Sequence, residues 1–155
     1  MDIKAFLSQK ISDALACYIK DIEALEEKDI LNSPGGSARS PIDFTYEIVM
    51  VNSRIASRLK GEDPGPWPFQ DGWAEAPEAF KSKSTAIAEV SDSTHEVIAA
   101  WNQLSDSDLL TVVPNLGEDT TKFSLGHLCA THLVYHDAQL NYVQGLKGDN
   151  KMHWD

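Results

Sequence analysis

Four long segments of the chain repeat apolar residues at intervals of three and four, and this periodicity limits the possible folds more than any other feature. The segments run from about Ile3 to Lys28, from Pro41 to Lys60, from about Ser82 to Leu104, and from about Phe123 to Leu146. Such spacing places apolar side chains on one face of an α-helix. No segment shows the sustained alternation of a half-buried strand. The sequence therefore predicts an all-α, up-and-down four-helix bundle.

The connections between these segments carry their own signals. Ser40 followed by Pro41 is typical of a helix N-cap with proline in the first turn, and Gly61 is a helix stop. The stretch from Gly61 to Phe80 is rich in proline and contains Trp67, Phe69 and Trp73. We expect a long crossover loop after the second helix, ordered by docking these three rings on the helices. Such a loop is either functional or a lid over an exposed edge of the core.

The period is lost between Ser105 and Lys122, where the chain contains Pro114. A short helical turn from Ser105 to Leu110, followed by a loop or a small hairpin, is expected there. The fourth helix should then end before Gly148, and Trp154 in the short tail should fold back onto the surface.

Length and charge restrict the functional classes. A chain of 155 residues can form one domain, 1–155, with its own core. Its net charge of −11 disfavours nucleic acid and anionic lipid as partners. No apolar stretch approaches the ~20 residues that span a bilayer, and the first residues lack a signal-peptide pattern. Cys17 and Cys129, expected to be buried and reduced, do not form a metal-ligand spacing. The expected location is the cytoplasm.

Two histidines interrupt the apolar stripe of the fourth helix. His132 and His136 are four residues apart, so they lie one above the other on the same face. Neutral imidazole is the commonest protein ligand for zinc, nickel or iron(II). In the second helix, Asn52 occupies a stripe position and could face the pair. The inward stripe of the fourth helix is expected to comprise Leu125, Leu128, His132, His136, Val143 and Leu146, with Gln139 beside it.

Spacing alone leaves a second interpretation open. Histidine pairs four apart also occur on helix surfaces and as hydrogen-bonded core residues. Tyr46, Tyr135 and Asp137 could act as acid, base or supporting groups near an ion, although such residues more often serve in packing or at the surface.

The segment HLVYHDAQLNYVQGL resembles the last helix of the DinB/YfiT-like superfamily of four-helix bundles, and SPIDFTYEIVMVNSRIASRL resembles its second helix. The resemblance implies a divalent metal ion, zinc or nickel, held by three histidines, one of them from the second helix. His132 and His136 match the pair of the last helix, and the remaining position falls on Asn52. An amide is a poorer ligand than imidazole, so weaker binding is expected, and Asn52→His should tighten it. Glu47 could substitute for Asn52, but it lies five residues away and is therefore expected on a different face.

What the resemblance implies about function is a metal-dependent enzyme of the transferase or hydrolase type, with a small-molecule thiol as a possible substrate. The alternative is a non-catalytic, stress-associated dimeric bundle whose histidine pair is structural or vestigial. Bundles of this superfamily commonly pair through helix faces, and Val49, Met50 and Leu133 lie off the main stripes. A homodimer is therefore expected.

Overall fold

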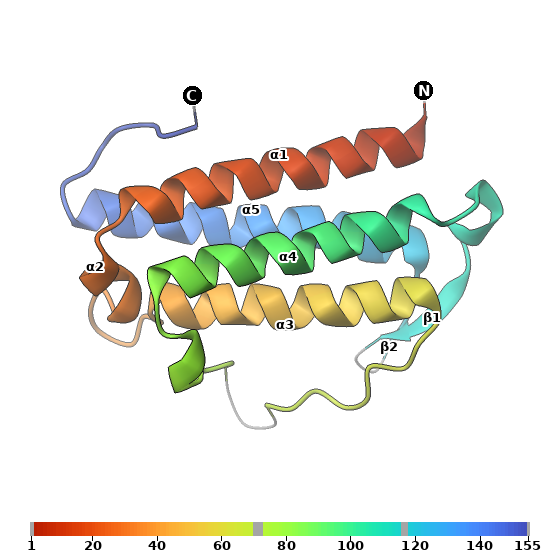
Figure 1. Ribbon diagram of the computed structural model, residues 1–155, viewed down its shortest axis with the longest axis horizontal. Coiled ribbons are helices and arrows are strands. Elements are labelled where there is room, and N and C mark those ends of the chain that lie inside the picture. The colour runs from red at the N-terminus through yellow and green to blue at the C-terminus, as the bar shows by residue number, and fades with distance from the viewer. Residues whose placement is uncertain (1, 70–72, 116–117, 155) are drawn as a thin grey trace.

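The computed structural model (Figure 1) describes residues 2–69, 73–115 and 118–154. Four long helices lie side by side: α1 (Ile3–Ala24), α3 (Pro41–Lys60), α4 (Lys83–Asn102) and α5 (Lys122–Leu146). The remaining elements are short: helix α2 (Glu27–Leu31), the 3-10 turns η1 (Glu78–Phe80) and η2 (Asp106–Asp108), and an antiparallel hairpin of strands β1 (Val112–Asn115) and β2 (Glu118–Thr121). The chain is mostly helical, as the periodicity predicts.

The order of the long helices differs from the expected up-and-down arrangement. Lys60, at the C-terminal end of α3, pairs with Glu96 in the second half of α4, so these neighbours run parallel (Figure 1). Ser8 in the first half of α1 bonds Asn102 at the end of α4, so that pair is antiparallel. The reason is the connection from residue 61 to residue 82, which carries the chain back along the molecule before α4 begins. The expected crossover loop is present, and it reverses the usual alternation.

One arginine fastens this connection to α3. The guanidinium of Arg54 donates to the carbonyl oxygens of Pro64, Gly65 and Pro66, and it also lies over the Trp67 ring at 5.6 Å. Trp67 contacts Phe69, whose ring meets Tyr46 of α3 edge-on. Two of the three expected rings therefore dock. Trp73 does not, since 69% of it is exposed and it contacts the Arg39 guanidinium from outside.

Several boundary predictions are confirmed and one is wrong. Ser40 is the N-cap of α3 with proline following it, and Gly61 ends that helix in the left-handed region at φ 85°. The helical turn and hairpin between residues 105 and 122 are present, and Trp154 returns to donate to Asp21 in α1. The first helix, however, breaks at Leu25 instead of continuing to Lys28. The break starts a separate turn, α2, which buries Ile30 completely.

The inward face of α5 is shifted from the expected one. Leu128 and Leu146 are exposed, whereas Leu133 is fully buried and so cannot contribute to a contact between copies of the chain. The residues of α5 that do reach the core include Leu125, Cys129, Leu133, His136, Leu140 and Val143. Their spacing of three and four keeps one face inward, displaced by about one residue from the predicted stripe.

Close packing of α5 requires a glycine. A Cβ added at Gly126 would lie 2.8 Å from the Trp101 ring of α4 and 3.0 Å from Leu7 of α1. Trp101 is itself fully buried, so neither neighbour has space to withdraw. Among the described residues, no helix is long and apolar enough to cross a membrane.

Candidate metal centre

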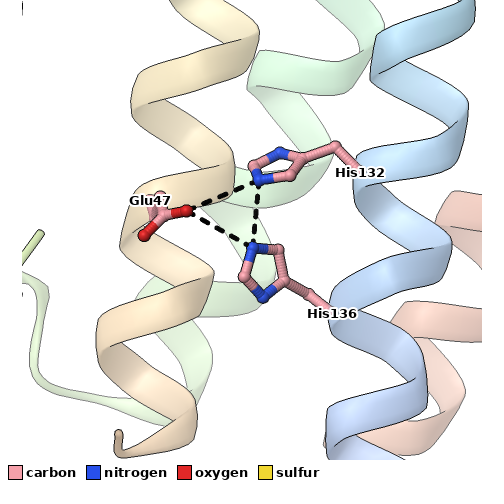
Figure 2. A group of neighbouring side chains, drawn as sticks. All are labelled: Glu47, His132 and His136. Atoms are coloured by element: carbon pink, nitrogen blue, oxygen red, sulfur yellow. Dashed lines mark hydrogen bonds and ion pairs between the residues drawn. The ribbon is translucent and has the colours of Figure 1, made fainter. Parts of the chain in front are cut away.

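Three side chains that can bind metal converge between α3 and α5 (Figure 2). Oε1 of Glu47 lies 3.6 Å from Nε2 of His132 and 3.6 Å from Nε2 of His136. The two Nε2 atoms are 3.0 Å apart. One ligand atom from each residue therefore falls within 4.8 Å of the others. The two histidines come from successive turns of α5 and the glutamate from α3, which faces them across the groove.

The glutamate corrects the expectation that Asn52 would complete the site. Five residues along an α-helix turn a side chain by roughly 140°, so Glu47 and Asn52 do point differently. It is Glu47 that points to the histidines. Asn52 is fully buried, where its amide donates to Thr94 of α4 and accepts from the Cys129 thiol. Its hydrogen bonds join three helices and leave the metal-ligand role to the glutamate.

His136 is the most enclosed member of the group. Only 1% of its side chain is exposed, against 14% for His132 and 13% for Glu47. Phe44 stacks on its ring with centroids 5.3 Å apart, and Tyr135 covers it edge-on at 4.9 Å. Because Nδ1 lies 2.8 Å from Oε1 of Gln139, Nδ1 carries the proton and the lone pair of Nε2 points toward His132 and Glu47. Gln139 thus fixes the tautomer that a metal ligand needs.

Arg39 supports the glutamate from the other side. Its Nη1 lies 2.6 Å from Oε2 of Glu47, and both side chains are largely buried. The same guanidinium donates through Nη2 to the backbone carbonyls of Asp43 and Ala74. One carboxylate oxygen is therefore held by Arg39, while the other faces the imidazoles. This arrangement orients Glu47 to bind an ion through one oxygen.

The surroundings of His136 and Glu47 favour the protonation states in which these two residues bind a metal. Burial lowers the pKa of His136 and the neighbouring His132 adds to this effect, which outweighs the opposing contacts with Glu47 and Gln139. For Glu47, burial alone would raise the pKa. The contacts with both histidines and the charge of Arg39 outweigh burial and hold its pKa well below the usual range. A neutral imidazole and an ionised carboxylate are the ligand forms.

The donor set fits a divalent ion. Two imidazoles and one carboxylate match the protein ligands of catalytic zinc sites, which leave a coordination position open. The imidazoles suit zinc, nickel and iron alike. Without an ion, the 3.0 Å separation of the Nε2 atoms needs a proton between them. In addition, the buried Nδ1 of His132 has no hydrogen-bond partner among the described residues.

The other residues named from the sequence are placed differently. Tyr46 packs against Phe69 and Phe80 and takes no part in the group. Asp137 faces α1, where it forms a buried carboxyl pair with Asp21. Asp21 accepts hydrogen bonds from three side chains, those of Asn141, Gln144 and Trp154. Burial first, and then the proximity of Asp21, raise the pKa of Asp137 to about 7.

Comparison with known proteins adds support for the fold alone. No protein-family model matches the sequence, and no curated protein matches it. Among solved structures, the chain is similar to a conserved protein from Enterococcus faecalis, with a TM-score of 0.74 and 14% sequence identity. The similarity covers 94% of this chain and 97% of the other. The fold is therefore shared by a protein of very different sequence.

Proposed function

We propose that the protein is a four-helix bundle that binds one divalent metal ion, zinc or nickel, through Glu47, His132 and His136 and uses it in catalysis. The observation that carries the proposal is the convergence of one carboxylate oxygen and two Nε2 atoms within 4.8 Å. The resemblance of the last helix to the DinB/YfiT-like superfamily agrees with it, with glutamate in place of the third histidine. The reaction class is hydrolysis or group transfer.

A bound ion of this kind lowers the pKa of a water molecule or thiol that it coordinates and so supplies a nucleophile at neutral pH. The chain contributes orientation. Gln139 holds the tautomer of His136, Arg39 holds one oxygen of Glu47, and Phe44 closes the buried side of the site. Because His132 and Glu47 remain partly exposed, a reactant can approach from the outer side of the α3–α5 groove.

The proposal is tested by calorimetric titration of the metal-free protein with zinc and nickel. We expect one ion per chain. Glu47→Gln keeps the size of the side chain but removes its charge, and His136→Ala removes a ligand; both should weaken binding at least about tenfold, which is ~1.4 kcal/mol. His127→Ala is the matched control, since His127 lies on the same helix and is exposed. If the wild type binds neither metal, the proposal fails.

A second titration decides whether Glu47 or Asn52 is the third metal ligand. Asn52→Ala should leave zinc binding intact, because its amide bonds Thr94 and Cys129 instead of the histidines. If Asn52→Ala lost zinc binding and Glu47→Gln kept the zinc affinity of the wild type, Asn52 would be the third ligand.

The second candidate is a structural polar cluster in a non-catalytic bundle. The observation that favours it is that His136 is hydrogen-bonded within the chain through both ring nitrogens. Under this alternative the homodimer remains a prediction, resting on Val49 and Met50 only. This alternative would be favoured if the purified protein contained no metal and a chelator did not lower its free energy of unfolding.

A further inference from the structure

A cavity of about 460 Å³ lies in the α3–α5 groove beside the candidate metal centre. Three of its lining residues also belong to that centre: Arg39 holds Glu47, Phe44 stacks on His136, and Gln139 bonds His136. From there the cavity continues along α5 toward its C-terminal end. The far wall includes Val143, two helical turns or ~10 Å beyond His136.

The size and lining of the cavity suit a small organic molecule. Its volume falls within the range of ligand pockets, ~300–1,000 Å³. At the ~30 Å³ that one water molecule takes in the liquid, the space holds roughly 15 non-hydrogen atoms. Away from Arg39 and Gln139 the wall is largely apolar, formed by Phe44, Val143 and Leu146. An apolar body is therefore favoured at that end.

Arg39 defines the polar end. A guanidinium has five N–H donors, and three contacts of Arg39 are to Glu47 and to the carbonyls of Asp43 and Ala74. Its Nε is buried and has no hydrogen-bond partner among the described residues. A buried donor without an acceptor is costly, and because Arg39 lines the cavity, a ligand carboxylate there can pair with its guanidinium.

The local charge around Arg39 determines whether a neutral or an ionised ligand oxygen is favoured. Without an ion, Arg39 and Glu47 balance each other; a divalent ion leaves this part of the groove with an excess of two positive charges. Asp43 also carries a negative charge, but its two carboxylate oxygens are directed to the Ala76 N–H and the Ser40 hydroxyl, and Asp43 does not line the cavity. On a chain with a net charge of −11, this is a local cationic site. It attracts a small anion by charge complementarity.

We propose that this cavity binds an organic acid with an apolar body, its carboxylate on Arg39 next to the metal and its body against Phe44, Val143 and Leu146. The inference rests on the proposed metal centre and names the class of molecule that the centre receives. The carboxylate pairs with the Arg39 guanidinium, and the apolar part fills the far end of the cavity.

Calorimetry on the zinc-loaded protein tests this with three probes. 4-Phenylbutyrate has 12 non-hydrogen atoms and fits the cavity. 4-Phenylbutanamide has the same shape without the charge, and acetate has the charge without the apolar body. We expect the amide and acetate each to bind at least about tenfold more weakly than 4-phenylbutyrate. Equal affinity for acid and amide, or for acid and acetate, would overturn the proposal.

Variants locate the site. Leu146→Asp in α5 and Ala38→Asp in the loop before α3 each place a negative charge on the lining of the cavity, at positions that are exposed and therefore tolerant. Both should weaken the binding of 4-phenylbutyrate at least about tenfold without changing zinc affinity. Leu110→Asp is the control, since Leu110 is an exposed leucine outside the cavity. Circular dichroism verifies that each variant is folded.

The two proposals fail in different ways. If zinc binds and 4-phenylbutyrate does not, the cavity proposal alone is overturned. The same holds if 4-phenylbutyrate binds the wild type and both cavity variants with equal affinity. If zinc does not bind to the wild type, the metal centre fails, and the cavity proposal, which depends on it, fails with it.

Discussion

The buried carboxyl pair between α1 and α5 predicts that Asp137→Asn stabilises the protein, by an amount that depends on pH. Asp137 is 5% exposed, and its pKa is raised from 3.8 to about 7 by burial and by Asp21. The folded protein therefore keeps this proton over a range of pH in which the unfolded chain releases it. As the pH rises from ~4 to ~7, the wild type loses folding free energy through this group, and above ~7 the loss is complete.

The magnitude follows from the size of the shift. A change of roughly three pKa units at 1.36 kcal/mol each gives an upper limit of ~4 kcal/mol. Asparagine has nearly the same shape, carries no charge, and can donate to Asp21. The variant should thus match the wild type near pH 4 and exceed it by up to ~4 kcal/mol at pH 8. For a chain of this length that corresponds to a rise of about 10 °C in Tm.

Urea unfolding of both proteins from pH 4 to pH 8, with a chelator present, measures this difference directly. Asp92→Asn on the exposed face of α4 is the control, and its difference from the wild type should not vary in this way. A gain for Asp137→Asn that is the same at pH 4 and pH 8, or a loss at pH 8, would refute the argument.

Three further outcomes are expected. Gly126→Ala should destabilise the fold by ~1–3 kcal/mol in urea unfolding, because its Cβ would meet Trp101 at 2.8 Å, whereas Gly145→Ala on the exposed face of α5 should not destabilise it. Zinc affinity should fall on acidification as the imidazole ligands protonate, and the lowered pKa of His136 means that this ring protonates below its ordinary range; calorimetry over a pH series measures the loss. Arg54→Met should speed proteolytic cleavage of the 61–82 connection, since it removes three contacts to backbone carbonyls, and gel electrophoresis of a timed digest measures the rate.

The helical segments and the histidine pair could be predicted because both depend on local sequence. Periodicity identifies a helix, and spacing by four places His132 and His136 together whatever the rest of the chain does. The break at Leu25 could not be predicted, because it depends on burying Ile30 against the rest of the core. Nor does periodicity indicate that α3 and α4 run parallel, which depends on the path of the long connection.

The third member of the site was assigned to Asn52 instead of Glu47 for a related reason. Glu47 lies three residues after Phe44 and next to Ile48, at the border of the apolar face of α3. A charged residue at such a border points into the groove between two helices, and that signal is present in the sequence. Choosing Glu47 over Asn52 requires the axial position of α3 relative to α5, which local patterns do not contain. Arg39, in the loop before α3, contributes through tertiary contacts alone.

The path of the connection between α3 and α4 has a consequence for how the chain folds. Over the described residues, the main helix contacts are α1 with α4 and α5, and α3 with α4 and α5; each joins a helix before the connection to one after it (Figure 1). Neither half buries its apolar faces within itself. During synthesis the N-terminal half therefore cannot fold stably before the C-terminal half has been made. Folding should also be slower than that of a helical protein built on local contacts. For the same reason, two fragments produced by a cut in the connection should each be largely unstructured, and should become helical when mixed.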